Sequence, residues 1–173
     1  MMELGLTWPL QRLLKTSVPY GTEPDRFRCW DAHCITLRGW SSLLLVHCAS
    51  RWTCVRYDMS LWDWAALPDL AQEEIRMGLR EAGIPENSVN AYLAENDQLI
   101  STRTHGRREV AFLNRAWEDV LAADWLIDPD SHHQPLLNSA VNDRPCRCAG
   151  FGGVDTARVF LIRCFQKQGE PVL

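Results

Sequence analysis

Three short apolar runs between positions 34 and 57 predict three β-strands, at Cys34–Arg38, Leu43–Cys48 and Trp52–Tyr57. Short links at Gly39–Ser41 and Ala49–Arg51 favour an antiparallel meander, because a parallel pair needs a longer crossover. Both faces of the predicted sheet are apolar, so we expect helices to cover at least one of them.

The link at Ala49–Arg51 also predicts how the second and third strands pair. A three-residue loop sets Cys48 against Trp52 and Val46 against Cys54. Side chains alternate between the two faces of a strand, so this register places those four side chains on one face. The pattern therefore predicts that cysteine and tryptophan side chains form one buried side of the sheet.

Apolar residues elsewhere in the chain recur mostly at helical spacing. Helices are expected at 68–82, 86–95, 108–125 and after a capping Asp155, and short candidate helices lie at 4–15 and 135–142. A fourth strand is expected at Leu99–Arg103. Strands that precede most of the helices are typical of the α+β class. We therefore expect a single α+β domain, in which an antiparallel β-meander of three to four strands packs with four to five helices.

The length of 173 residues fits one domain with a sizeable core. Within 1–173 we expect an N-terminal helix and loop at 1–27, a core at 28–128, and a C-terminal extension with the last helix at 129–173. The start of the chain lacks a signal-peptide pattern, and the longest strongly apolar run, Leu43–Val46, is too short to cross a membrane. We therefore expect a cytoplasmic protein with no membrane partner.

Seven cysteines cannot all pair within one chain, and most lie in apolar strand or helix patterns. Free, buried thiols are therefore expected. Zinc is the alternative, because six potential ligands lie close together in sequence: Cys29, His33, Cys34, His47, Cys48 and Cys54. Only Cys29 and His33 have the close spacing typical of structural zinc sites. We expect no metal and no cofactor.

Cys146 and Cys148 form a second cysteine pair, downstream of His132 and His133. Their spacing is tighter than the usual zinc pattern, so a loop is expected there rather than a metal site. An exposed Cys146 beside Arg144 could instead have a lowered pKa and be reactive.

The net charge of −4 gives the chain no general attraction to nucleic acid. The charge is unevenly distributed, because residues 59–98 carry −6, residues 99–117 carry +3 and residues 118–130 carry −5. The middle segment is the only part that favours a nucleic-acid role, so we rank that role third.

The start of the predicted helix at 108–125 combines a glycine, Gly106, with neighbouring basic residues. Free backbone N–H groups at a helix start suit a phosphate or carboxylate when guanidinium groups lie beside them. The alternative, which we favour, is a salt bridge from these arginines to Glu109 or to other acids. If a pocket exists there, a histidine could act as an acid or base. The candidate ligand-binding residues are Thr104, His105, Arg107 and Arg108.

A surface for another protein is the leading functional hypothesis. Trp62 and Trp64 lie between predicted elements of the acidic 59–98 segment, and tryptophan is enriched at interface hot spots. We therefore expect Trp62 and Trp64 to be exposed and to contact a partner. The sequence does not identify a catalytic residue or an oligomeric state.

Several segments resemble a small bacterial domain family of unknown function. The similar segments are Trp30–His33, Ser42–Val46 and Trp52–Met59, which correspond to the family's tryptophan-led strand and hairpin. An acidic helix that ends at Gly83–Pro85 and a second long helix at Arg107–Trp117 continue the similarity.

The resemblance covers roughly residues 28–125 and departs from the family at Trp40–Ser42, where the family has basic residues. It implies a small bacterial domain but supplies no activity. The acidic 59–98 segment with Trp62 and Trp64, and not the resemblance, leads us to expect a cytosolic, non-enzymatic protein-binding or regulatory module. The alternative is a protein or enzyme that binds a phosphate or carboxylate ligand at Thr104–Arg108.

Overall fold

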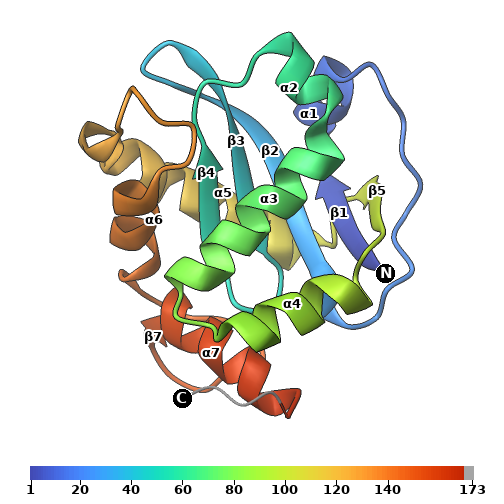
Figure 1. The fold of residues 1–173 in the computed structure, drawn as a ribbon, viewed down its shortest axis with the longest axis vertical. Coiled ribbons are helices and arrows are strands. Elements are labelled where there is room, and N and C mark those ends of the chain that lie inside the picture. Colours follow the sequence, from blue (N-terminus) through green and yellow to red (C-terminus); the bar gives the residue numbers. More distant parts are fainter. Residues whose placement is uncertain (170–173) are drawn as a thin grey trace.

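A five-stranded sheet forms the centre of the computed structural model, which describes residues 1–169. Its strand order is β4-β3-β2-β1-β5, and helices cover both of its faces (Figure 1). The strands are β1 (Met2–Leu6), β2 (Cys29–Leu37), β3 (Trp40–His47), β4 (Thr53–Arg56) and β5 (Leu99–Arg103), with a separate short pair of β6 (Pro145–Cys146) and β7 (Asp155–Thr156).

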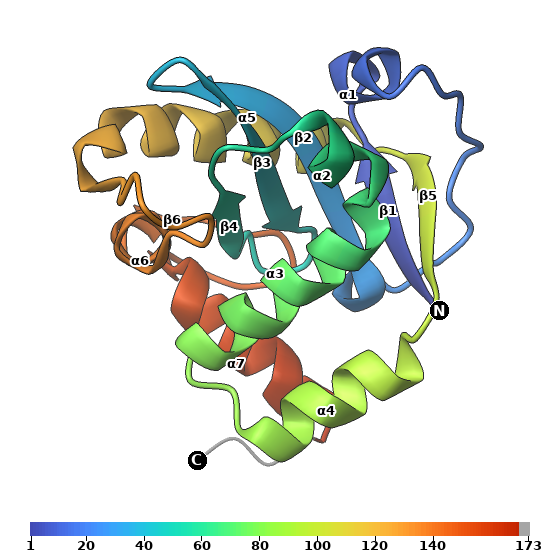
Figure 2. The same ribbon diagram turned by 45° about the horizontal axis from the view of Figure 1, so that its top comes forward.

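Seven α-helices pack around the sheet in the part of the chain that the structure describes. The predicted α+β class is confirmed, but the sheet has five strands rather than three to four, and the helices outnumber the predicted four to five. The helices are α1 (Trp8–Leu13), α2 (Leu61–Ala65), α3 (Leu67–Glu81), α4 (Glu86–Glu95), α5 (Arg107–Ala122), α6 (Pro135–Asn142) and α7 (Ala157–Lys167), with 3-10 turns η1 (Arg26–Arg28) and η2 (Asp124–Leu126). Helices α3, α4 and α7 lie on one face of the sheet, and α5 and α6 lie on the other (Figure 2). Within residues 1–169, no helix has both the length and the apolar character needed to cross a membrane.

Strand β1 corrects the helix that was predicted at 4–15. Met2–Leu6 lies between β2 and β5 and pairs in parallel with both, so the sheet is mixed rather than a pure antiparallel meander. All residues of β1 are buried. A strand buried on both faces lacks the alternation of apolar and polar residues by which half-exposed strands are recognised. Only Trp8–Leu13 is helical, with Pro9 tolerated in its first turn.

Strands β2, β3 and β4 form the antiparallel meander that the sequence predicts. The turn between β2 and β3 consists of Arg38 and Gly39, with φ of 48° and 85°, and Leu37 pairs directly with Trp40. Two successive residues at positive φ are typical of a type I′ turn, whose twist suits a tight hairpin. Strand β3 therefore begins at Trp40 instead of the predicted Leu43, while β2 runs from Cys29 to Leu37 instead of Cys34 to Arg38.

The loop between β3 and β4 shifts the predicted register by one residue. The backbone N–H of His47 donates to the carbonyl of Trp52, so the loop occupies 48–51 instead of 49–51. Consequently Cys54 pairs with Leu45 and not with Val46. When the pairing register shifts by one residue, each side chain of the strand changes face relative to its neighbours in the partner strand.

The sheet separates two hydrophobic cores, and the register decides which side chains enter each. The larger core, under α3, α4 and α7, contains Trp52 and Cys54 together with Leu45. The other, under α5 and α6, contains Val46 and Val55. Cysteine and tryptophan side chains are therefore buried as predicted, but their neighbours differ from the predicted ones.

Most local elements agree with the sequence prediction. Helices α4 and α6 and strand β5 have the predicted bounds, and α3 begins and ends one residue earlier. Helix α5 ends at Ala122 and the 3-10 turn η2 follows it. The cap of α7 is Thr156, whose hydroxyl accepts a hydrogen bond from the N–H of Val159, and not Asp155. Helix α2 was not predicted.

Two asparagines of α6 complete the hydrogen bonding of the edge strand β4. Asn138 Oδ1 accepts a hydrogen bond from the N–H of Val55 at 3.0 Å. Asn142 Oδ1 accepts from the N–H of Thr53 at 2.8 Å, and its Nδ2 donates to the carbonyl of Thr53 at 2.7 Å. Side chains one helical turn apart thus reach alternate residues of the strand, and they cover an edge that would otherwise be free to pair.

Candidate functional site

The side chain of His105, at the junction between β5 and α5, lies buried between two carboxylates. Its Nδ1 is 2.7 Å from Asp31 Oδ1, and its Nε2 is 3.0 Å from Glu3 Oε2. Ionised carboxylates only accept hydrogen bonds, so both ring nitrogens donate and the ring carries a positive charge. His105 is therefore the centre of a buried ion cluster and not a free acid or base.

The three groups of this cluster have shifted pKa values. Burial by itself would lower the pKa of His105, but hydrogen bonds and charge attraction from Asp31 and Cys29 raise it to about 10. Burial raises the pKa of Asp31 even though His105 opposes that effect. The pKa of Glu3 is lowered, because hydrogen bonds from the backbone N–H groups of Thr22 and Glu23 and from His105 outweigh its burial.

Strand β1 brings the cluster together because it lies between the two strands that supply its other members. Glu3 and Gly5 belong to β1, Asp31 belongs to β2, and His105 follows β5. Gly5 pairs with Asp31 in one ladder and with Thr102 in the other. A Cβ at Gly5 would lie 2.0 Å from Asp31 Oδ1 and 2.9 Å from His105 Nδ1, so the ion pair needs glycine there.

Two cysteines border this ion cluster. Cys48 Sγ lies 3.6 Å from His105 Nδ1, and Cys29 Sγ lies within 4.8 Å of ligand atoms of Glu3 and His105. Burial raises the pKa of Cys48 well above its usual range, and the charge of Asp31 adds to the shift. Because Cys48 is a thiol and His105 has no free lone pair, they do not form a nucleophile and base.

Of the two arginines at the start of α5, Arg108 forms the salt bridge to Glu109 that was the favoured alternative, and Arg26 of η1 joins it. Arg108 Nη2 lies 3.1 Å from Glu109 Oε1, and Arg26 Nε lies 3.5 Å from the same oxygen. Arg26 also donates to the backbone carbonyl of His105 at 3.0 Å. A Cβ at Gly106 would meet Glu109 Oε2 at 2.9 Å, so this carboxylate lies over the start of its own helix.

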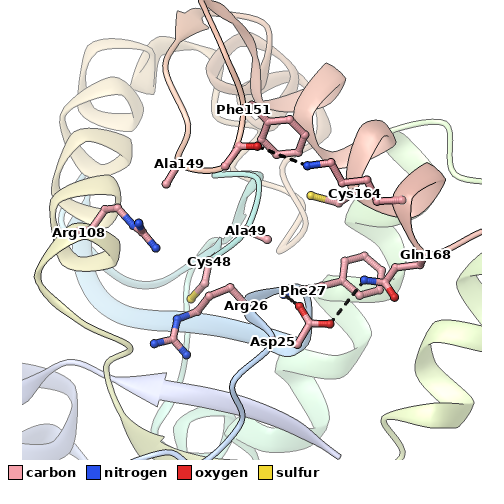
Figure 3. Close-up of a pocket in the computed structure, with 12 residues that line it drawn as sticks. Asp25, Arg26, Phe27, Cys48, Ala49, Arg108, Ala149, Phe151, Cys164 and Gln168 are labelled. Carbon is pink, nitrogen blue, oxygen red and sulfur yellow. Dashed lines mark hydrogen bonds between the residues drawn. The ribbon is translucent and has the colours of Figure 1, made fainter.

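A pocket of about 190 Å³ opens beside this salt bridge, between η1, the start of α5 and α7 (Figure 3). Its basic residues are Arg26, Arg108 and Lys167, and its aromatic residues are Phe27 and Phe151. The other lining residues are Asp25, Cys48, Ala49, Ala149, Gly150, Cys164 and Gln168. The pocket therefore combines positive charge, apolar surface and two thiols.

The structure separates the four predicted ligand-binding residues. Arg108 lines the pocket, whereas His105 is buried behind it beside Cys48. Thr104 is half-buried and Arg107 is exposed, and neither lines the pocket. Sequence reasoning missed Arg26 and Lys167, because they come from η1 and α7, far from residue 108 in the chain.

The two predicted surface tryptophans have different environments. Trp62 is 86% exposed, but Trp64 is only 4% exposed and its Nε1 donates to Ser41 Oγ at 3.1 Å. The prediction that Trp64 is exposed was wrong, because its side chain points into the core from α2. Leu61, which is 82% exposed, and Trp8 accompany Trp62 among the exposed apolar residues.

All seven cysteines are free thiols. Cys148 is buried and donates a hydrogen bond to the carbonyl of Ala49, and burial raises its pKa to about 11. Burial also raises the pKa of Cys146, so the predicted reactive thiol at this position is not supported. The proposed histidine ligand His133 instead lies between Glu74 and Glu81.

The zinc ligands considered at 29–54 also divide among separate environments. His33 contacts Thr7 Oγ1 at 2.6 Å, and His47 contacts Ser50 Oγ at 2.7 Å. Cys54 belongs to the core under α3. Two of these candidates instead lie beside His105. Cys29 is grouped with Glu3 and His105, and Cys48 is grouped with Asp31 and His105.

Comparison with known proteins identifies a family. The family model for DUF6933, described as a domain of unknown function, matches residues 3–156. No curated protein matches the chain, and no solved structure matches it. The resemblance noted in the sequence covered roughly residues 28–125, and the matched range extends beyond it at both ends. It reaches into β1, which supplies Glu3 and Gly5 to the ion cluster.

Proposed function

We propose that this chain, which belongs to the DUF6933 family of domains of unknown function, binds a small anionic ligand in the pocket beside α5. The observation that supports this proposal is the convergence of Arg26, Arg108 and Lys167 on one pocket from three separate elements. Arginine and lysine side chains bind phosphate and carboxylate groups by charge-assisted hydrogen bonds. The ligand class is therefore a phosphate- or carboxylate-bearing small molecule.

The basic residues Arg26, Arg108 and Lys167 outnumber the nearby carboxylates, which are Asp25 in the lining and Glu109 beside it, so the charge balance favours an anion. Arg26 and Arg108 share one carboxylate, that of Glu109. Lys167 Nζ lies 3.4 Å from the carbonyl oxygen of Gly150. The Arg108 side chain is 60% exposed, so it can turn from Glu109 toward a ligand at little cost.

The apolar lining suits the remainder of such a ligand. Phe27 and Phe151 both line the pocket, and Lys167 Nζ lies 4.0 Å from the centre of the Phe151 ring. A volume of about 190 Å³ is smaller than that of typical drug-sized sites, which begin at about 300 Å³. The pocket therefore suits a compact ligand with one anionic group and a small ring or short chain.

The neighbouring groups favour binding over catalysis. His105 is charged and held by two carboxylates, and Cys48 is protonated at neutral pH. Neither can remove a proton from a ligand without breaking the buried ion cluster. A binding or sensing role agrees with these protonation states.

Calorimetric titration with phenyl phosphate and with benzoate tests the proposal. We expect the wild-type protein to bind at least one probe, and Arg108→Ala to weaken that binding about tenfold, because a charge-assisted contact is lost. Arg115→Ala is the matched control, since Arg115 is an exposed arginine of α5 outside this pocket. Absence of binding, or equal binding by Arg108→Ala, would contradict the proposal.

A second candidate function is protein binding through the exposed apolar residues Leu61, Trp62 and Trp8. The observation that favours it is the high exposure of two adjacent large apolar side chains at the start of α2. A photo-crosslinking residue placed at Trp62 should capture one discrete partner in cells. The same residue placed at Trp125, which is also an exposed tryptophan, should not capture it.

A further inference from the structure

Three potential metal ligands from distant parts of the chain meet behind the pocket. They are Asp31 of β2, Cys48 after β3 and His105 before α5, and their ligand atoms all lie within 4.8 Å of one another. We infer that Asp31 Oδ1, Cys48 Sγ and His105 Nδ1 bind a divalent transition-metal ion of the zinc type. This inference does not depend on the proposed anion binding, since the metal alone tests it.

The sulfur–nitrogen distance agrees with tetrahedral coordination, and the oxygen–nitrogen distance requires an adjustment. Zinc lies about 2.3 Å from sulfur and about 2.0 Å from nitrogen, so two such ligands of a tetrahedral ion are about 3.5 Å apart. Cys48 Sγ and His105 Nδ1 are 3.6 Å apart. The 2.7 Å between Asp31 Oδ1 and His105 Nδ1 is a hydrogen-bond length, and it must widen by about 0.6 Å when a metal replaces the shared proton.

The other side of the imidazole ring has the partner that metal-binding histidines usually have. His105 Nε2 donates to Glu3 Oε2 at 3.0 Å. Glu3 is held in turn by the backbone N–H groups of Thr22 at 2.7 Å and Glu23 at 2.9 Å. A carboxylate that accepts from the distal ring nitrogen orients the ring and makes the proximal nitrogen a better ligand.

The buried charge is balanced in both states. In the structure His105 Nδ1 lies at hydrogen-bond distance from Asp31, and a metal must displace that shared proton together with the thiol proton of Cys48. Metal binding releases these two protons and introduces an ion with two positive charges, so the net charge of the cluster does not change. The exchange therefore avoids the large cost of burying additional charge.

The ligand types and the position of the site define the metal and its remaining ligand. A thiolate with an imidazole selects zinc or cobalt over magnesium and calcium, which prefer oxygen ligands. Cys48 also lines the pocket. A fourth ligand, such as water, can thus enter from the pocket, as in zinc sites that keep one open position.

Cobalt provides the direct test, because charge transfer from a thiolate to cobalt gives an absorption band in the near-ultraviolet, here called the thiolate band. The full-length, reduced protein is treated with a chelator and titrated with cobalt chloride in phosphate-free buffer. We expect one equivalent of cobalt to produce the thiolate band and one equivalent of zinc to remove it. Cys48→Ser should lose the band, whereas Cys54→Ser, a buried cysteine in the core under α3, should retain it.

Further variants distinguish the proposed ligands from their neighbours. Glu3→Gln should keep the band but weaken metal affinity about 10- to 100-fold, because it alters the orienting carboxylate. His105→Asn should abolish binding, and because it also removes the buried cation between Asp31 and Glu3, its thermal unfolding is measured and Cys48→Ser remains the deciding variant. Absence of the band, or an unchanged band in Cys48→Ser, would overturn the inference. Loss of the band in Cys29→Ser but not in Cys48→Ser would do the same, since it would place the metal on the Glu3 side of His105.

Discussion

Gly5 lies directly opposite Asp31 in the parallel ladder between β1 and β2, and a Cβ at Gly5 would lie 2.0 Å from Asp31 Oδ1. The glycine thus leaves the space in which the Asp31 carboxylate reaches His105. The glycine in this central strand therefore has a steric role, because its lack of a side chain leaves room for the ion cluster.

The first prediction concerns this contact. Gly5→Ala should lower the free energy of unfolding by about 2–3 kcal/mol, because it overpacks the strand and pushes apart a buried charge pair. Urea unfolding measures the change. Gly152→Ala is the control, since a Cβ at Gly152 would have no atom within 4 Å. Equal stability of the two variants would show that Asp31 can move at no cost.

The second prediction concerns the asparagines that cover the edge of β4. Asn142→Ala should lower the free energy of unfolding by about 2–4 kcal/mol, because it leaves both backbone groups of Thr53 without a partner in a buried position. Chemical denaturation of Asn142→Ala and of Asn114→Ala, an exposed position in α5, provides the comparison. If both variants unfold alike, α6 does not stabilise β4 through these bonds.

The third prediction concerns alkaline pH. His133 lies between Glu74 and Glu81, which raise its pKa from 6.5 to about 9 against the effect of burial. A raised pKa in the folded state means that its stabilising contribution is complete below pH 6.5 and is lost as the pH rises toward 9. The free energy of unfolding should therefore fall across this interval, by about 1–3 kcal/mol from His133.

Unfolding experiments at a series of pH values test the assignment. His133→Gln should have a shallower pH dependence than the wild type, and His105, whose pKa is raised to about 10, contributes to the slope that remains. His132→Gln is the control, because His132 contacts the backbone carbonyl of Tyr57 rather than a carboxylate. An unchanged slope in His133→Gln would refute the assignment.

The fourth prediction concerns acidic pH. Burial lowers the pKa of His47 to about 4, and its ring contacts Ser50 Oγ and the carbonyl of Phe27. A lowered histidine pKa means that its contribution to stability is present above about pH 6.5 and is lost as the pH falls toward 4. Nitrogen chemical shifts of the imidazole should show a neutral His47 ring at pH 5.5, and a charged ring at that pH would contradict this environment.

The sequence by itself determined the elements whose signals are local. The helices at 86–95 and 135–142 and the strand Leu99–Arg103 have the predicted bounds, and the antiparallel meander was also predicted. Periodicity, capping and turn residues act over a few positions, so they can be recognised without the fold. The same local pattern indicated Arg108 and the salt bridge to Glu109 at the start of α5.

Only the tertiary structure decided which distant segments meet. Strand β1 is buried on both faces and therefore resembled part of a helix, and one extra loop residue moved Cys54 to the opposite side of the sheet. The cluster of Glu3, Asp31 and His105 depends on the position of β1 between two parallel neighbours. Parallel pairing joins strands that are separated by long connections, so no local pattern in the sequence encodes these contacts.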